Sequence, residues 1–280
     1  MEKNRFPGDE LRVKKEKLYG ILRSCGSVAV AFSGGVDSTY LLHAAREVLG
    51  EGAAAVTACS PLFPARETEE AKAWCRDHAI RQLLIAPEEL SFEDFADNPP
   101  DRCYRCKRNL LGKIVRAAGE AGFACVADGS NVDDEGDYRP GMRAVDELGV
   151  RSPLREAGLG KEEIRRLSRA CGLPTADKPS FACLASRIPY GDAITEEKLR
   201  MADRAEQVLR EEGFRQYRVR IHGSLARIEI LPEEFERIRE DRVRDRICRS
   251  FREIGFSYTA LDLQGYRTGS MNETLMREKA

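Results

Sequence analysis

Two short stretches of this chain carry residue types whose spacing suits chemistry. The first, Ser33-Gly34-Gly35-Val36-Asp37-Ser38, follows an apolar, valine-rich run and precedes a helix-like pattern. The second is a pair of cysteines, Cys103 and Cys106, with the C-x-x-C spacing that indicates metal or redox chemistry in a cytosolic chain. The sequence therefore suggests an anion-binding loop and a metal or redox site.

The loop at residues 33–38 has the features of an anion site. Gly34 and Gly35 let the backbone approach a ligand, and the amides at the start of the following helix point outward with the positive end of the helix dipole. The lysine of a Walker A loop is absent, and so is the G-x-G-x-x-G of a dinucleotide-binding turn. The alternative is an ordinary glycine-rich turn, but S-G-G-x-D-S between a strand and a helix favours a functional loop.

The cysteines of the C-x-x-C lie at or just before a predicted helix start, where the helix dipole favours the thiolate. A four-cysteine zinc site would need a second C-x-x-C, which the sequence lacks. The best third ligand is Cys183, in the long proline-bearing stretch 173–192. Three thiolates on a cubane cluster leave one iron open to a substrate or to sulfide, whereas electron-transfer clusters use four. The alternative is that Cys103 and Cys106 are incidental or pair as a redox switch.

The elements that must position these residues follow from hydrophobic patterning. Buried strands are predicted at 27–32, 53–59, 81–86 and 123–128, alternating with helices at 9–24, 38–49, 65–79 and about 105–118. This alternation predicts an α/β fold with a parallel sheet covered on both faces. A further helix is predicted at 161–172, before the proline-bearing stretch. The elements after that stretch, helices at 195–212 and about 233–254 and strands at 215–222, 225–231 and 257–263, are typical of a smaller α+β domain. We expect a domain over 1–175 that carries the S-G-G-x-D-S loop, a cysteine-bearing loop over 176–192 and a substrate or oligomerisation domain over 193–280.

Composition limits the class of protein. Hydrophobic residues make up 42% and charged residues 33% of 280 residues, which indicates a folded chain rather than a disordered or membrane-spanning one. Residues 1–17 lack the apolar run of a secretion signal, so we expect a cytoplasmic protein without membrane contact. The net charge of −1, from 46 basic and 47 acidic residues, argues against a nucleic-acid partner.

Basic side chains in the second half suit an anionic ligand. Arg218 and Arg220 alternate on a predicted strand and so share one face, and Arg187 follows Cys183 by four residues. Guanidinium forks match phosphate and carboxylate groups. A solvated edge strand is the alternative for each arginine alone, and the cluster leaves phosphate binding and surface charge as equal alternatives.

The stretch Ser33 to Ser38 resembles the PP-loop of the ATP pyrophosphatases, a superfamily that includes GMP synthetase, NAD synthetase and tRNA-thiolating enzymes. The resemblance implies an adenine nucleotide α-hydrolase-like fold and cleavage of ATP between its α and β phosphates. Two further stretches, 57–61 and 128–134, resemble the adenine contact and the second nucleotide loop. The residues that it implicates in nucleotide binding are Ser33, Gly34, Gly35, Asp37, Ser38, Ser60, Ser130, Asn131 and Asp133.

A narrower resemblance covers residues 10 to 275. The stretches FSGGVDST, RCYRCK, DKPSFACLASRIPYG, RVRIHG, ARIEI and DLQGYRTGSMNE, in this order, resemble the LarE family of sulfur transferases. Members adenylate a carboxylate of pyridinium biscarboxylic acid mononucleotide and convert it to a thiocarboxylate, during assembly of the nickel-pincer nucleotide cofactor of lactate racemase. The family also implies ATP, Mg²⁺, a sulfide or persulfide source and a homo-oligomer, a hexamer.

The family has two variants of sulfur delivery. In one, a single cysteine gives up its sulfur and becomes dehydroalanine; in the other, three cysteines hold a 4Fe-4S cluster whose open iron carries sulfide. The sacrificial position matches Cys183, and the presence of Cys103 and Cys106 fits the cluster variant. Carboxylates suit the Mg²⁺ that accompanies ATP, which makes Asp37 or Asp133 a candidate ligand. With an anionic nucleotide as substrate, Arg187, Arg218 and Arg220 are the candidates for its phosphate. Alternatives are the single-cysteine route, tRNA thiolation, an amide-forming ligase and a non-catalytic nucleotide-binding module.

Overall fold

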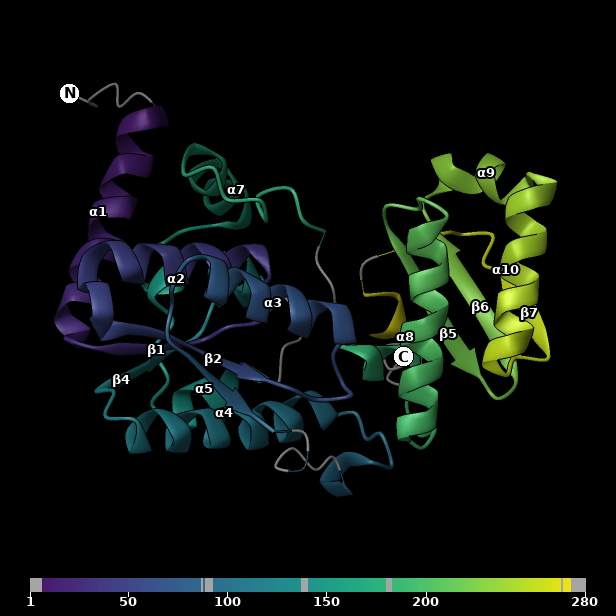
Figure 1. The fold of residues 1–280 in the computed structure, drawn as a ribbon, viewed down its shortest axis with the longest axis horizontal. Coiled ribbons are helices and arrows are strands. Elements are labelled where there is room, and N and C mark those ends of the chain that lie inside the picture. The colour runs from purple at the N-terminus through teal and green to yellow at the C-terminus, as the bar shows by residue number, and fades with distance from the viewer. Residues whose placement is uncertain are drawn as a thin grey trace. The chain divides into compact units, whose positions relative to one another are not determined.

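A computed structural model describes residues 7–86, 88, 93–136, 141–179, 183–267 and 269–272. The chain forms two compact units (Figure 1). The first comprises Met1–Ser60, Arg66–Phe92 and Cys103–Ser180. The second comprises Pro61–Ala65, Glu93–Arg102 and Phe181–Ala280, so the chain passes between the units several times. The three-part division expected from the sequence stays a prediction.

A four-stranded parallel sheet forms the centre of the first unit. Its strands run in the order β3-β2-β1-β4, with β1 at Val28–Ala31, β2 at Ala53–Ala58, β3 at Gln82–Ile85 and β4 at Cys125–Ala127. The central strands are continuous apolar runs because helices cover both of their faces. The predicted α/β class with a parallel sheet is confirmed.

Alternate residues of β1 enter different cores, as the two-residue period of a strand requires. Val28 and Val30 pack in one core with α1 and α2, whereas Ala29 packs in the other with α4. Figure 1 shows α1, α2 and α3 on one face of the sheet and α4 and α5 on the other. The helices of this unit are α1 (Pro7–Cys25), α2 (Val36–Leu49), α3 (Ala65–Asp77), α4 (Arg102–Glu120), α5 (Gly141–Glu147), α6 (Pro153–Glu156) and α7 (Lys161–Ala170).

The second unit is built on a three-stranded mixed sheet in the order β5-β6-β7. The strands β5 (Tyr217–His222) and β6 (Leu225–Ile230) pair antiparallel, and β7 (Tyr258–Leu261) pairs parallel to β6. Buried side chains of these strands pack with α8 (Glu196–Glu211) and α10 (Asp241–Ile254). The expected small α+β unit is confirmed.

Three local features differ from the sequence-based expectation. The helix expected over about 233–254 is interrupted at Glu240, whose backbone is extended (ψ 123°), giving α9 (Phe235–Arg239) and α10. The helix expected from about residue 105 begins at Arg102, which places Cys103 and Cys106 inside its first two turns. The short helices α5 and α6 were not expected, because each is too short to show a helical period.

Candidate functional site

The loop between β1 and α2 is shaped around two glycines. Gly34 has a left-handed backbone (φ +71°), and a Cβ there would stand 3.4 Å from the Ala71 Cβ of α3. Gly35 is the N-cap of α2 and brings no side chain to its amides. The Ser38 hydroxyl donates to the Gly35 carbonyl oxygen (3.2 Å) and accepts from the Ser33 amide (3.4 Å). The start of α2 therefore presents backbone amides that no N-cap side chain covers, as an anion site requires.

The loop after β4 lies directly against this helix start. A Cβ on Gly129 would stand 3.1 Å from the Ser38 nitrogen, so only a glycine fits here without displacement. Ser130 and Asn131 follow and are buried, and the Asn131 side-chain oxygen accepts from the Asp133 amide (3.0 Å). The sheet order that makes β4 the neighbour of β1 thus brings the two sequence-predicted nucleotide loops together.

Asp37 and Asp133 are linked through Lys161, the first residue of α7. The Lys161 ammonium pairs with an Asp37 oxygen, and its backbone amide donates to Asp133 (2.6 Å). Burial raises the pKa of Asp37 above its usual value, although Lys161 opposes this shift. The second Asp37 oxygen, Oδ1, is buried and has no hydrogen-bond partner among the described residues. An unpartnered carboxylate oxygen beside uncapped amides fits a divalent cation bound together with phosphates.

A buried carboxylate at the end of β4 organises the second loop. Asp128 accepts hydrogen bonds from the hydroxyls of Ser130 (2.6 Å) and Ser152 (2.7 Å) and pairs with Lys107 (3.0 Å). Burial opposes the charge of Asp128, but Lys107 and the hydroxyls outweigh burial and lower its pKa. Sequence reasoning singled out neither Asp128 nor Lys107, although Lys107 directly follows Cys106.

A second lysine missed from the sequence contacts the loop itself. The Lys178 ammonium donates to the Gly34 carbonyl oxygen (3.1 Å) and pairs with Glu67 (2.6 Å) and Glu70 (2.8 Å) of α3. The only sequence signal was its place in DKPSFACL, a stretch noted for its cysteine. Ser60, the expected adenine contact, is buried just after β2, the neighbour of β1 in the sheet.

The three cysteines of interest belong to different units. Cys103, which is exposed, and Cys106, which is half-buried, lie on α4 in the first unit, and three residues apart they face the same side of the helix. Cys183 is half-buried in the second unit, directly before the 3₁₀ turn Leu184–Arg187. Within the described ranges, no three His, Cys, Asp or Glu side chains group as a metal site. The three-cysteine ligand set stays a prediction.

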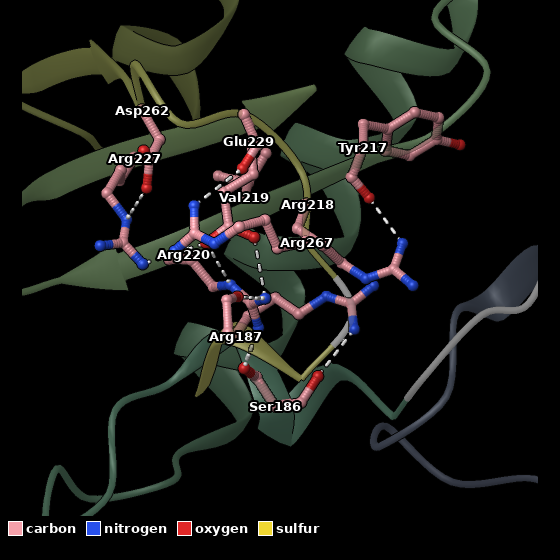
Figure 2. A network of polar contacts seen from close by, with 12 residues as sticks. Ser186, Arg187, Tyr217, Arg218, Val219, Arg220, Arg227, Glu229, Asp262 and Arg267 are labelled. Carbon is pink, nitrogen blue, oxygen red and sulfur yellow. Dashed lines mark hydrogen bonds and ion pairs between the residues drawn. The ribbon is translucent and has the colours of Figure 1, made fainter. Parts of the chain in front are cut away.

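The three candidate arginines of the second unit, Arg187, Arg218 and Arg220, are buried rather than solvated, although β5 is an edge strand of its sheet. Arg187 forms a two-pronged ion pair with Glu206 (both distances 2.7 Å), and Arg220 forms one with Glu229 (3.0 and 2.8 Å). Figure 2 shows Arg187 and Arg220 in contact with Ser186, and the Arg218 side chain directed to the Tyr217 carbonyl oxygen. Burial opposes both charges of the first pair, but their mutual attraction lowers the pKa of Glu206 and raises that of Arg187.

Arg218 differs from its neighbours in its electrostatic environment. It donates to the Tyr217 carbonyl oxygen (2.6 Å), and its guanidinium lies 5.1 Å from the centre of the Tyr266 ring. Burial, and then the positive charge of Arg187, lower the pKa of Arg218 to about 10. A buried guanidinium beside two others is stabilised by an anion, so this cluster has the electrostatics of a phosphate or carboxylate site.

Comparison with known proteins shows the family of the chain. The chain is 39% identical over 269 residues to the pyridinium-3,5-bisthiocarboxylic acid mononucleotide synthase of Lactiplantibacillus plantarum, covering 95% of this chain and 96% of that one. This chain belongs to the LarE family. A relative in Synechocystis, an uncharacterized protein, is 41% identical over 267 residues, with 95% of this chain and all of the relative covered.

A more distant similarity supports the PP-loop assignment of the LarE chain. A glutamine-hydrolyzing GMP synthase chain of Methanococcus maripaludis is 26% identical over 204 residues, covering 65% of this chain and 63% of the synthase chain. No family model matches the chain. No helix within the described residues has the length and apolar composition needed to cross a membrane.

Proposed function

We propose that this protein is an ATP-dependent sulfur transferase that adenylates a carboxylate of pyridinium biscarboxylic acid mononucleotide and converts it to a thiocarboxylate. The name of the Lactiplantibacillus relative supports the substrate class. The observation that carries the proposal is that the start of α2 holds both uncapped backbone amides and an Asp37 oxygen that has no hydrogen-bond partner among the described residues. These groups suit the phosphates of ATP and the cation that accompanies them.

Different residues of the first unit act in the first step, the adenylation of the carboxylate. The amides at the start of α2 and the Ser33 and Ser38 hydroxyls bind the pyrophosphate that leaves ATP. Asp37, with Asp133 close by, would hold Mg²⁺, which neutralises phosphate charge when bound. Lys161 offsets the charge of Asp37 before the nucleotide binds. Adenylation is needed because a free carboxylate is a poor electrophile and hydroxide is a poor leaving group, whereas AMP leaves readily.

The arginines of the second unit suit the phosphate of the mononucleotide. Arg218 and Arg220 share one face of β5, as the sequence predicted, and both are buried. The guanidinium fork of Arg220 already binds Glu229, whereas burial and nearby positive charge disfavour the charge of Arg218. A dianionic phosphate reverses this penalty, which makes Arg218 the stronger candidate of the two.

Sulfur delivery is proposed to use Cys103, Cys106 and Cys183. Thiolates are the ligands that iron–sulfur clusters prefer, and the i, i+3 spacing on α4 suits two ligands of one cluster. A three-cysteine 4Fe-4S cluster supplies an open iron for a transferable sulfide when it is bound. Delivery of sulfur from Cys183 itself is the second candidate, because Cys183 precedes a turn that contacts the buried arginines.

A product assay tests the proposal. The purified protein is incubated with ATP, Mg²⁺ and the dicarboxylate mononucleotide, and pyrophosphate, AMP and the thiocarboxylate are measured. We expect AMP and pyrophosphate only when the mononucleotide is present. Release of ADP and phosphate would exclude the PP-loop mechanism, and pyrophosphate release stimulated by tRNA but not by the mononucleotide would favour tRNA thiolation.

A further inference from the structure

Arg187 has contacts unlike those of a ligand-binding arginine. Its exposed fraction is 0%, and its Nε and Nη2 groups both bind Glu206, which is 1% exposed. Its Nη1 group donates to the Cys183 carbonyl oxygen (3.3 Å) and to the Ser186 hydroxyl (2.8 Å). The guanidinium thus joins α8 to both ends of the segment Cys183–Ser186.

Glu206 is itself fixed by the sheet. Its Oε1 accepts the Val219 amide of β5 (3.1 Å) as well as the Arg187 Nε group. The opposite end of the turn is held by Arg220, whose Nη1 donates to the Ser186 carbonyl oxygen (2.6 Å) and whose fork binds Glu229 (Figure 2). Two buried ion pairs, each anchored on regular secondary structure, therefore hold the backbone on which Cys183 lies.

We propose that Arg187, held by Glu206, is a positioning residue that fixes the backbone of Cys183 for sulfur delivery. This inference rests on the proposed role of Cys183 in sulfur transfer. Arg187 acts through the Cys183 carbonyl oxygen rather than through the substrate. A thiol must be held close to its productive position, because a displacement of about 1 Å costs on the order of a hundredfold in rate.

The test must remove the contact without leaving a buried charge. Replacing Arg187 alone leaves Glu206 buried and unpaired, which can prevent folding. The double variant Arg187→Met with Glu206→Gln removes both charges, and the glutamine oxygen still accepts the Val219 amide. The single variant Arg187→Lys keeps the positive charge but loses the two-pronged geometry, and it should retain part of the function.

A matched control exists in the first unit. Arg151 forms a two-pronged pair with Glu156, and Glu156 also accepts a backbone amide, that of Ser152 (3.2 Å). The variant Arg151→Met with Glu156→Gln therefore makes the same chemical change in the first unit, whereas Cys183 belongs to the second. It should leave the alkylation rate of Cys183 unchanged.

The first measurement is the alkylation rate of Cys183 by iodoacetamide in reduced, chelator-treated protein, followed by peptide mass spectrometry. Exposed Cys103 and buried Cys75 serve as internal references in the same sample. We expect the Arg187→Met, Glu206→Gln variant to alkylate Cys183 severalfold faster with both references unchanged. An unchanged Cys183 alkylation rate would overturn the proposal. Faster alkylation of buried Cys75 would identify unfolding of the double variant, and the Cys183 alkylation rate of Arg187→Lys then decides by the same criterion.

The second measurement separates positioning from substrate binding. A positioning role predicts that kcat for thiocarboxylate formation falls about tenfold or more while KM for the mononucleotide is unchanged. A rise in KM with unchanged alkylation would make Arg187 a substrate ligand and overturn the proposal. Alkylation needs neither ATP nor substrate. A wild-type protein that forms no thiocarboxylate would therefore contradict the proposed function, while the alkylation rates still test Arg187.

Discussion

Gly129 and Ser38 lie so close that a single methyl group between them would disturb the nucleotide loops. A Cβ on Gly129 would stand 3.1 Å from the Ser38 nitrogen and 3.3 Å from the Asp37 Cβ. These contacts are with backbone and with the first side-chain atom, neither of which can swing away. The loop after β4 is thereby held at the amides that we assign to pyrophosphate.

The substitution Gly129→Ala should therefore weaken ATP binding. The added methyl must displace the loop or the first turn of α2, so KM for ATP in pyrophosphate release should rise at least severalfold. Gly112→Ala in α4 is the control, because no described atom beyond its chain neighbours and the backbone of its own helix lies within 4 Å of a Cβ at this position. That change should leave KM unchanged and stabilise the helix by about 0.5–1 kcal/mol. Equal KM values for both variants and wild type would show that the two loops are not coupled in ATP binding.

Asp37→Asn should abolish pyrophosphate release without lowering thermal stability. Folding raises the pKa of Asp37, because burial disfavours its carboxylate form. The protonated form of Asp37 therefore stabilises the folded state at low pH, and this contribution is lost as pH rises through the folded-state pKa. The neutral amide removes this penalty at neutral pH. Thermal unfolding with and without Mg²⁺-ATP checks the prediction: the wild type should gain stability from the nucleotide and the variant should not. A variant that retains pyrophosphate release would exclude Asp37 from the mechanism.

Asp128 should stabilise the protein in the opposite pH range. Lys107 and two hydroxyls lower the pKa of Asp128 despite its burial. Its contribution to folding stability is therefore complete above the pKa of the unfolded chain, about 3.9, and is lost as pH falls through the folded-state pKa. Urea unfolding at pH 7 should show Asp128→Asn to be less stable than wild type. The difference should shrink as pH is lowered below about 4. A difference that does not change with pH would show that Asp128 acts through its shape rather than its charge.

Arg218→Ala should reduce the affinity for the mononucleotide. Loss of a charge-assisted contact costs about 1.5–3 kcal/mol, which corresponds to roughly a tenfold to hundredfold weaker Kd. Titration calorimetry with the mononucleotide measures this, and the exposed Arg215→Ala is the control. The same test on Arg220 uses Arg220→Lys, because alanine would leave Glu229 buried without its partner. Unchanged affinity of the Arg218 variant would assign this arginine to the structure of the sheet.

Serine replacement of Cys103, Cys106 or Cys183 should remove both the iron–sulfur absorbance and catalytic sulfur transfer. Iron and sulfide analysis after anaerobic purification gives the stoichiometry, and Cys125→Ser and Cys171→Ser are the controls. Mass spectrometry after a single turnover separates the two routes of sulfur delivery. An intact Cys183 supports the cluster, whereas dehydroalanine at residue 183 in iron-free protein would show that the cysteine itself supplies sulfur.

Local patterns were sufficient for the strands, most helices and the positions of the loops at 33–38 and 128–134. Strands such as β1 are short apolar runs, and S-G-G-x-D-S carries its own turn geometry, so residues near in sequence decide the structure. Lys161 and Lys178 were missed for the converse reason: each contacts the loop at 33–38 across more than a hundred residues. A lysine that pairs over such a separation has the same local pattern as one on the surface.

The sequence by itself determined the fold class, the family resemblance and the residue types available for chemistry, because these depend on periodicity and on motifs a few residues long. Only the tertiary structure decided which charges meet. Arg187 follows Cys183 by four residues, and its neighbours in sequence suggested a phosphate ligand. Its fully buried pairing with Glu206 depends on how the turn Leu184–Arg187 packs against α8. Burial and charge pairing are properties of packed elements, so they appear only once the chain is folded.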